Sequence, residues 1–306
     1  MKKDLLAYSA LTAICLIWGT TYMALRIAVL HLPPFLFVTI RQLIAGALLI
    51  GIIMLTQKVA WPGIRDIRYQ AVAGFFLITI GNGLVAWAEV HIPSGIAAMI
   101  CSLVPLVVIM INLTVNREER PNIPIVVGIG LGFAGITMIF GGEVSQFANG
   151  SYLLGMIVTF IAVIGWAGGS VWIKKRKTQT NLFMNVGLQM FFGGVWMIPF
   201  SLAFDDLSAV RWSAEAGYAL VYLIVFGSVI AFTCYTYALR NLPMTIVSLY
   251  AYVNPIVAVI LGWLVLDEKL TVTMGIAIMI TVAGIYIVNR GYQLRNQWKA
   301  QLTPDG

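Results

Sequence analysis

The chain repeats one pattern of prolines and acidic residues after an interval of 150 positions. The landmarks are Pro93, Pro105 and Glu118 in the first copy and Pro243, Pro255 and Glu268 in the second. The residues between the landmarks are mainly apolar in both copies. A repeat of this length predicts a chain built from two halves of the same structure.

Composition excludes a water-soluble fold. The 306 residues are 60% hydrophobic and 10% charged, with a mean hydropathy of +0.92, whereas a soluble domain has about 25% charged residues. Ten apolar stretches each approach the ~20 residues that a helix needs to cross a bilayer. They cover residues 5–25, 35–55, 70–90, 95–115, 123–141, 152–173, 182–204, 217–239, 244–266 and 271–289. The sequence therefore predicts an all-α polytopic membrane protein with ten transmembrane helices.

The distribution of Lys and Arg predicts how these helices are oriented. With a cytoplasmic N-terminus, 15 of the 19 basic residues fall on the cytoplasmic side, and such an excess marks cytoplasmic loops. These residues are Lys2, Lys3, Lys58, Arg65, Arg68, Arg117, Arg120, Lys174, Lys175, Arg176, Lys177, Arg240, Arg290, Arg295 and Lys299. Arg26, Arg211 and Lys269 fall outside, and Arg41 falls within a helix. We expect both termini in the cytoplasm.

Each copy of the repeat holds five helices, an odd number, so the second copy must enter the membrane from the opposite side. We expect a first five-helix repeat over residues 1–145, an inverted second repeat over 146–290 and a cytoplasmic tail over 291–306. Inverted repeats are typical of secondary transporters, which bind their substrate between the two halves. This architecture favours a carrier.

Several short motifs, taken in their order, resemble the EamA-like branch of the drug/metabolite transporter superfamily. They are Ile17-Trp18-Gly19-Thr20-Thr21-Tyr22, Pro34 with Arg41, Gly81-Asn82-Gly83 with Ala88-Glu89, Pro93 to Ala98, Ser248 to Pro255, and Asp267-Glu268-Lys269. The likeness covers nearly the whole chain, up to about Arg290. It implies a ten-helix metabolite carrier of the bacterial inner membrane, often an exporter of amino acids or similar small compounds.

A polar stripe runs along the third expected helix, where Thr79, Asn82 and Glu89 fall on one face. Glu89 is the only carboxylate within the ten expected spans, and a charge there costs about 2.5–3.5 kcal/mol on insertion scales. We expect Glu89 to act in gating, substrate contact or proton coupling. The alternative is a side chain near the outer end of the helix that reaches interfacial water.

Arg41 is the one basic residue of the sequence that falls within the expected spans. It follows Pro34 by seven residues, about 10 Å into the membrane at 1.5 Å per residue. We expect it to act in gating or coupling, either by pairing with Glu89 or by contacting an anionic group of the cargo.

Aromatic residues predict the wall of a cavity. Trp18 and Tyr22 are four residues apart on the first helix, and Trp166 has the place in the sixth helix that Trp18 has in the first. Tyr252 precedes Asn254 on the ninth helix. Rings with polar tips can line a site for flat or amphipathic cargo, and packing or a place at the lipid interface is the alternative.

Pro105 and Pro255 have corresponding positions in the fourth and ninth helices. Each removes a backbone hydrogen bond, and paired interruptions point to the binding region of a transporter. We expect them to break both helices beside the cavity, with a simple packing kink as the alternative. Asn254, which precedes Pro255, has Val104 as its counterpart, so the expected site is chemically asymmetric.

Two further features complete the predicted architecture. Gly128, Gly130, Gly132 and Gly135 form a small-residue face on the fifth helix, for close helix packing or for dimerisation. Asp205-Asp206 is expected in an outer loop, exposed to solvent.

The sequence contains no His-Glu-x-x-His, Gly-x-Ser-x-Gly or phosphate-binding loop motif, and these motifs mark hydrolytic enzymes and ATP-driven pumps. We predict a secondary transporter, not an enzyme, that works by alternating access without a cofactor or a metal. A facilitative or exchange carrier is the first alternative, and a channel or an intramembrane enzyme is the second. The expected partners are a small-molecule substrate, membrane lipids and, in a coupled carrier, protons. We expect no nucleic acid and a monomer or weak dimer.

Overall fold

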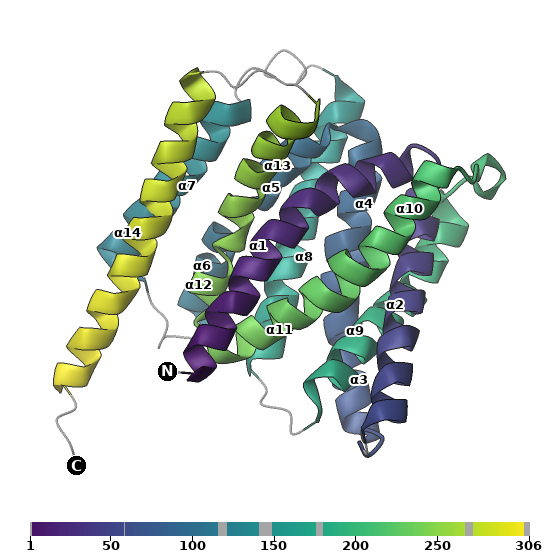
Figure 1. Cartoon of the computed structure of the whole chain (residues 1–306), viewed down its shortest axis with the longest axis horizontal. Helices are drawn as coiled ribbons and strands as arrows, with labels where there is room; N and C mark the ends of the chain where they lie inside the picture. Colours follow the sequence, from purple (N-terminus) through teal and green to yellow (C-terminus); the bar gives the residue numbers. More distant parts are fainter. Residues whose placement is uncertain are drawn as a thin grey trace.

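The computed structural model describes residues 2–57, 59–115, 121–140, 149–175, 180–266 and 272–302. The elements in these ranges are all helical (Figure 1). In chain order they are α1 Lys2–Val29, α2 Pro34–Thr56, α3 Ile64–Gly74, η1 Phe75–Gly83, α4 Leu84–His91, α5 Ser94–Cys101, α6 Val104–Val115, α7 Ile123–Phe140, α8 Gly150–Lys175, α9 Leu182–Phe204, η4 Leu207–Ala209, α10 Ala214–Tyr222, η5 Leu223–Ile230, α11 Ala231–Asn241, α12 Met244–Val247, α13 Tyr250–Leu266 and α14 Val272–Leu302. Glu118 and Glu268 of the repeat lie outside the described residues, as do Lys58, Arg117, Arg120, Arg176, Lys177 and Lys269.

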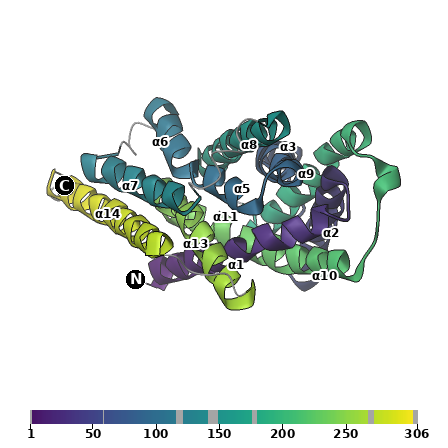
Figure 2. The same cartoon turned by 90° about the horizontal axis from the view of Figure 1, so that it is seen from above.

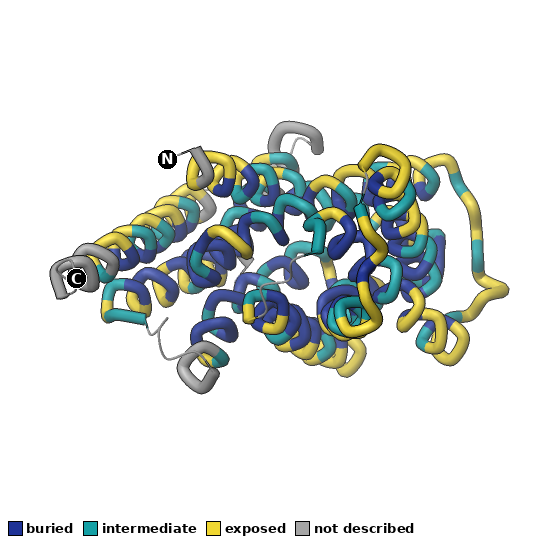
Figure 3. Tube along the Cα trace, turned by 90° about the horizontal axis from the view of Figure 1, so that it is seen from below, coloured by how far each residue is buried: buried dark blue, intermediate teal, exposed yellow. Residues whose placement is uncertain are grey.

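Eight helical segments of the described chain are long and apolar enough to cross a membrane. Two shorter apolar helices, Ile123–Met138 and Met244–Val257, coincide with the other two expected segments. Many large apolar residues are exposed on the helices. Figure 3 shows the exposed residues in yellow and the buried residues in dark blue. A surface of this kind suits hydrocarbon and not water. The protein is therefore a multi-pass membrane protein.

α14 runs past the last expected span to Leu302, so the residues of the expected tail that the structure describes, 291–302, are helical. Figure 1 shows that the start of α1 and the end of α14 lie at the same end of the helix bundle.

Helices that are distant in the sequence pack in pairs. α2 packs along α9, and α7 packs along α14 at one edge of the molecule (Figures 1 and 2). α1 packs against α13, α10 and α11, while α8 packs against α5, α6, η1 and α4. The interior of the molecule therefore lies between α1, α8 and the helices that pack against them.

Glycines bring α7 and α14 into backbone contact. A Cβ atom on Gly128 would lie 2.6 Å from the carbonyl oxygen of Gly284, and Gly132 and Gly135 are also closely approached by α13 and α14. Gly130 has open space around it. The predicted small-residue face of this helix is thus a packing face, and Gly130 is not part of it.

The third and eighth expected spans each contain a π-helical stretch, η1 and η5. The two spans run from Ile64 to His91 and from Ala214 to Asn241, and both are longer than expected. π-Helical turns are rare, and they occur frequently at functional sites.

The fourth and ninth expected spans are interrupted, but at different places. Residues 102–103 separate α5 from α6, next to Pro105. Residues 248–249 separate α12 from α13, and Pro255 lies inside the continuous helix α13. The prediction that Pro255 breaks its helix is therefore wrong.

A serine lies at the start of each interruption. Ser102 donates its hydroxyl hydrogen to the carbonyl oxygen of Met99, and Ser248 donates to that of Thr245. A hydroxyl that binds the backbone three residues earlier competes with the helical hydrogen bonds at that turn. Both serines are buried, so the local bond also satisfies a polar group that water cannot reach.

Asp205, at the end of α9, caps the N-terminus of α2. Its carboxylate accepts hydrogen bonds from the N–H groups of Leu36 at 2.6 Å and Phe35 at 3.4 Å. α2 has no capping side chain at its own N-cap residue, so Asp205 supplies the acceptor that the helix start requires. Burial raises the pKa of Asp205, although these N–H groups oppose the shift. The prediction of a solvated Asp205 is therefore wrong, while Asp206 is exposed.

Candidate substrate cavity

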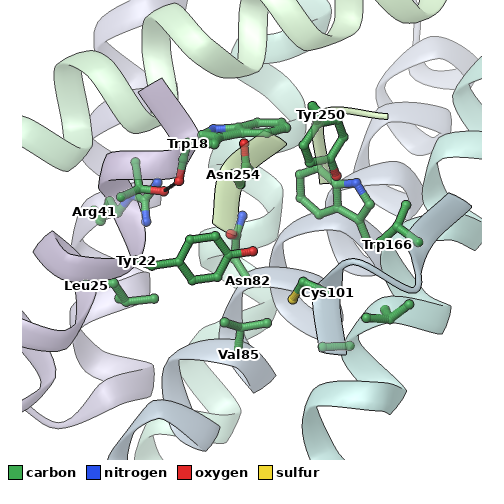
Figure 4. Close-up of a pocket in the computed structure, with 15 residues that line it drawn as sticks. Trp18, Tyr22, Leu25, Arg41, Asn82, Val85, Cys101, Trp166, Tyr250 and Asn254 are labelled. Atoms are coloured by element: carbon green, nitrogen blue, oxygen red, sulfur yellow. Dashed lines mark hydrogen bonds between the residues drawn. The ribbon is translucent and has the colours of Figure 1, made fainter. Parts of the chain in front are cut away.

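A cavity of about 90 Å³ lies in the interior of the helix bundle. Its lining comprises Trp18, Thr21, Tyr22 and Leu25 of α1, Arg41 of α2, Gly81 and Asn82 of η1, Val85 of α4, Cys101 of α5, Val104 of α6, Ala162, Val163 and Trp166 of α8, and Tyr250 and Asn254 of α13. Segments from both copies of the repeat therefore converge on one cavity, which Figure 4 shows in close-up.

Aromatic rings form one wall. The ring centroid of Trp18 lies 5.4 Å from that of Trp166 and 4.9 Å from that of Tyr250, and both pairs meet edge to face. Tyr235 of α11 supports the wall at 5.2 Å from Trp18 and 5.3 Å from Trp166. Aromatic pairs in this geometry are favourable beyond the area that they bury. The wall is thus a packed aromatic cluster with one side open to the cavity.

Two carboxamides contribute neutral polar groups. Figure 4 shows Asn82 and Asn254 between Trp18 and Tyr22. With its amide oriented to donate, Asn254 lies 3.0 Å from the carbonyl oxygen of Tyr250 and 3.1 Å from that of Cys15. This arrangement links α13 to α1 and leaves the amide oxygen of Asn254 as an acceptor.

Arg41 brings a positive charge to the cavity. Its side chain is only 5% exposed, and its Nε donates a hydrogen bond of 2.9 Å to the hydroxyl of Ser228 on η5. The other two nitrogens of the guanidinium group form no hydrogen bond with a described residue and are available to a ligand. The residues that line the cavity include no carboxylate, so this charge is not neutralised by a lining group.

Trp18 is attached to the same π-helical segment. Its indole Nε1 donates a hydrogen bond of 3.1 Å to the carbonyl oxygen of Gly227, the residue before Ser228. Two cavity residues of the first half, Trp18 and Arg41, are therefore held by consecutive residues of η5. In contrast, the indole nitrogen of Trp166 is buried and has no hydrogen-bond partner among the described residues.

Glu89 is completely buried and lies beside the cavity without lining it. Among the described residues, neither of its carboxylate oxygens has a hydrogen-bond partner. The expected pair with Arg41 is not formed, because Arg41 is bound to Ser228 instead. Glu89 also does not reach interfacial water in this conformation.

The charge that acts on Glu89 belongs to Arg26, near the end of α1. The two side chains do not form an ion pair, and Nη1 of Arg26 is buried without a hydrogen-bond partner among the described residues. Glu89 is also close to Tyr22 and Cys101, which line the cavity. A carboxyl without partners at full burial is a costly arrangement.

Six of the residues that the sequence predicted for binding or gating line the cavity. They are Trp18, Tyr22, Arg41, Asn82, Trp166 and Asn254. Thr79 lies elsewhere, with its hydroxyl bound to the carbonyl oxygen of Gly193 on α9 at 3.0 Å. Tyr252 donates to the carbonyl oxygen of Ile129 at 3.0 Å and so fastens α13 to α7. Pro105 and Pro255 do not line the cavity themselves, but each follows a residue that does, Val104 and Asn254.

Among the lining residues that the sequence analysis did not predict, Tyr250 is the aromatic one. It lies four residues before Asn254, so both face the same side of α13, whereas Tyr252 faces a different side. The spacing of four residues to Asn254 is the signal in the sequence from which Tyr250 could have been predicted. No sequence spacing of this kind identifies Tyr235, because its place beside the cavity wall depends on the packing of α11 against α1 and α8.

Two segments of the chain match the same known protein family. The model of the EamA-like transporter family matches residues 5–141 and again residues 153–290. This protein belongs to the EamA-like transporter family. The resemblance that the short motifs indicated is thereby confirmed, and each match covers five of the ten expected apolar segments.

Three relatives of this EamA-like transporter are similar to it over most of the chain. The inner membrane transporter YedA of Escherichia coli (strain K12) is 34% identical over 289 residues, covering 94% of this chain and 92% of YedA. The transporter YvbV of Bacillus subtilis (strain 168) is 25% identical, with coverage of 91% and 90%. Protein PecM of Dickeya dadantii (strain 3937) is 26% identical, with coverage of 89% and 88%. The protein is accordingly a multi-pass transporter of the inner membrane.

One solved crystal structure has the same fold. It superposes with a TM-score of 0.77 at 18% identity and covers 94% of this chain and 98% of the other. At this identity the similarity extends to the fold alone.

A second cavity of this EamA-like transporter, about 270 Å³, lies at the end of the bundle opposite the start of α1. It is lined by residues of the α1–α2 connection and the region after α9, among them His31, Asp205 and Asp206. Trp87, Val90 and His91 of α4 also line it. α4 therefore carries Glu89 at its buried side and borders this cavity at its end.

Proposed function

We propose that this protein is a secondary carrier that moves small metabolites out across the inner membrane by alternating access. The observation that carries the proposal is the interior cavity described above, lined by aromatic rings, two carboxamides and Arg41. Its lining comes from both copies of the repeat, which is where carriers with two related halves bind their cargo. The groups present bind and orient a molecule, and we assign them no catalytic step.

Two inverted halves account for the way in which the helices pair. The family model matches each half separately, and η1 and η5 occupy corresponding places in the two halves. α1 packs on α13 as α8 packs on α5 and α6, which is the reciprocal contact that an inverted repeat produces. The basic residues at the termini and at Lys174-Lys175 favour the cytoplasmic side for both chain ends.

Alternating access requires the two halves to move relative to one another about the cavity. In this conformation the hydrogen bonds from Trp18 to Gly227 and from Arg41 to Ser228 connect them across η5. A rocking motion would exchange these bonds for others, at a cost that bound cargo offsets by its differential affinity for the two states. We assign η5 as the segment whose contacts change.

Proton coupling is assigned to Glu89. A buried carboxyl without partners is stable only when it is neutral or acquires a cationic partner, and Arg26 is the cation close enough to act on it. A conformational change that joins or separates Glu89 and Arg26 would therefore take up or release a proton. The neighbouring residue Val90 lines the cavity at the end of α4, and we assign that cavity as the side from which the proton reaches Glu89.

The test is counterflow in proteoliposomes loaded with a panel of metabolites, with and without an imposed pH gradient. Intact protein is compared with Glu89→Gln and with Glu215→Gln, which removes an exposed carboxylate at the start of α10. Accumulation that the gradient drives, lost in Glu89→Gln and kept in Glu215→Gln, is the expected result. Saturable flux that is unchanged by the pH gradient and by the Glu89→Gln substitution would identify a facilitator or exchanger. Absence of flux for every compound would contradict the carrier function. Export is the direction that the family resemblance implies, and uptake into inverted vesicles checks it.

A further inference from the structure

Arg41 carries a charge that no other group of the cavity balances. Apart from the bond between Nε and Ser228, its guanidinium makes no hydrogen bond or ion pair with a described residue. The side chain is nevertheless almost fully buried. Because a buried charge without a partner is costly, a ligand that brings an anionic group to Arg41 removes a large part of that cost.

The rest of the polar lining is neutral. Thr21 and Tyr22 present hydroxyl groups, and Asn82 and Asn254 present carboxamides. Glu89 is buried and does not line the cavity. The lining of the described chain therefore offers a cation for an anionic group and no carboxylate for an ammonium group.

The aromatic wall and the size of the cavity limit the body of the ligand. Trp18, Trp166 and Tyr250 present ring edges and faces that suit a flat apolar group. A water molecule needs about 10–15 Å³ of such volume, so the cavity of about 90 Å³ has room for about six to nine waters. This space suits a small organic molecule.

We infer that the cavity selects small monocarboxylates with a flat apolar body. The carboxylate binds the free nitrogens of Arg41, a pairing that is strong and directional, and the body packs against Trp18 and Trp166. The inference rests on the proposed carrier function, in which this cavity holds the cargo. It narrows the cargo to organic anions, and it ranks an anion above the amino acid of the same shape, whose ammonium group meets no carboxylate and is repelled by Arg41.

Four probes that share a phenylethyl body test the ranking on the intact protein purified in detergent. They are 3-phenylpropionate, phenylalanine, 2-phenylethylamine and 3-phenylpropanamide, and binding is measured by calorimetry and by tryptophan fluorescence. We expect 3-phenylpropionate to bind at least about tenfold more tightly than the amide or phenylalanine, a ratio that one charge-assisted contact supplies, and the amine to bind most weakly. Tighter binding of phenylalanine or the amine, or no binding of any probe, would overturn the inference.

Variants then assign the selectivity to Arg41. Arg41→Gln should remove the preference for the acid over the amide, while Arg65→Gln, which removes an exposed positive charge on α3, should keep it. A preference that survives in Arg41→Gln would contradict the assignment. Arg41→Lys keeps the charge without the planar fork and should retain part of the preference. If both Arg41 variants fail to fold, the ranking of the four probes on the intact protein still decides the inference.

Flux measurements separate this inference from the carrier function. The same four probes are tested for transport in proteoliposomes of the intact protein. Binding of 3-phenylpropionate without flux of any compound would contradict the carrier function and leave the anion site in place. Flux of phenylalanine in preference to 3-phenylpropionate would support the carrier and overturn the anion selectivity.

Discussion

The indole nitrogen of Trp18 donates a hydrogen bond of 3.1 Å to the carbonyl oxygen of Gly227. The next residue, Ser228, accepts a hydrogen bond from Arg41. One π-helical turn of η5 therefore positions both the aromatic wall and the charge of the cavity. Residues of a helix that is distant in the sequence thus control the geometry of the predicted binding residues.

Trp18→Phe should destabilise the protein, because it removes this bond and keeps a ring in the wall. We expect a loss of about 1 kcal/mol, the net value of one hydrogen bond, seen as a lower midpoint of thermal unfolding in detergent. Trp166→Phe is the matched control, because the nitrogen that it removes has no partner among the described residues. Equal losses in the two variants would contradict a stabilising bond from Trp18 to Gly227.

Ser228→Ala should weaken the binding of 3-phenylpropionate about fivefold, since loss of one hydrogen bond of ~1 kcal/mol leaves Arg41 less well oriented. The affinity for 2-phenylethylamine should not fall, because the amine does not use Arg41. Calorimetry measures both affinities. Thr233→Ala is the control, since the hydroxyl of Thr233 binds the carbonyl of Val229 in its own turn. An equal loss for both ligands would point to a general change in the cavity.

Gly128→Ala should destabilise the contact between α7 and α14. The new methyl group would lie 2.6 Å from a backbone oxygen of Gly284, and overpacking of this kind costs about 1–3 kcal/mol. Gly130→Ala, two residues away, has open space and should be neutral or gain up to about 1 kcal/mol from helix propensity. Thermal unfolding compares the two variants, and a Gly130→Ala variant that is the less stable of the two would refute the packing face.

Asp205→Ala should lower the stability of the protein by about 1 kcal/mol, the usual cost of losing a helix cap. The N–H groups of Leu36 and Phe35 would lose their acceptor at the start of α2. Asp206→Ala is the control, since Asp206 is exposed and binds only within its own turn, to Ser208. The midpoint of thermal unfolding should fall less for the control, and the reverse order would exclude the cap.

Much of the architecture could be predicted because it depends on local properties of the sequence. Apolar stretches of membrane-spanning length, the repeat and the order of short motifs identified a polytopic transporter of the EamA-like family. Six of the predicted site residues line one cavity, since polar and aromatic groups are uncommon inside apolar helices and tend to serve function there. The sequence analysis placed Tyr252 in the cavity wall, where the structure has Tyr250. The two residues are two positions apart and lie on different sides of α13, and only the side of Tyr250 faces the cavity.

The chain alone determined that it spans a membrane, which family it belongs to and which helices bear polar groups. The tertiary structure decided which of those groups meet: that Arg41 binds Ser228 and not Glu89, that Arg26 is the cation acting on Glu89, and that Asp205 caps α2. The physical reason lies in the helices themselves. They are apolar on nearly every side, so their sequences do not distinguish the face that packs inward from the face that meets lipid. Only the packing of helices that are far apart in the chain resolves that choice.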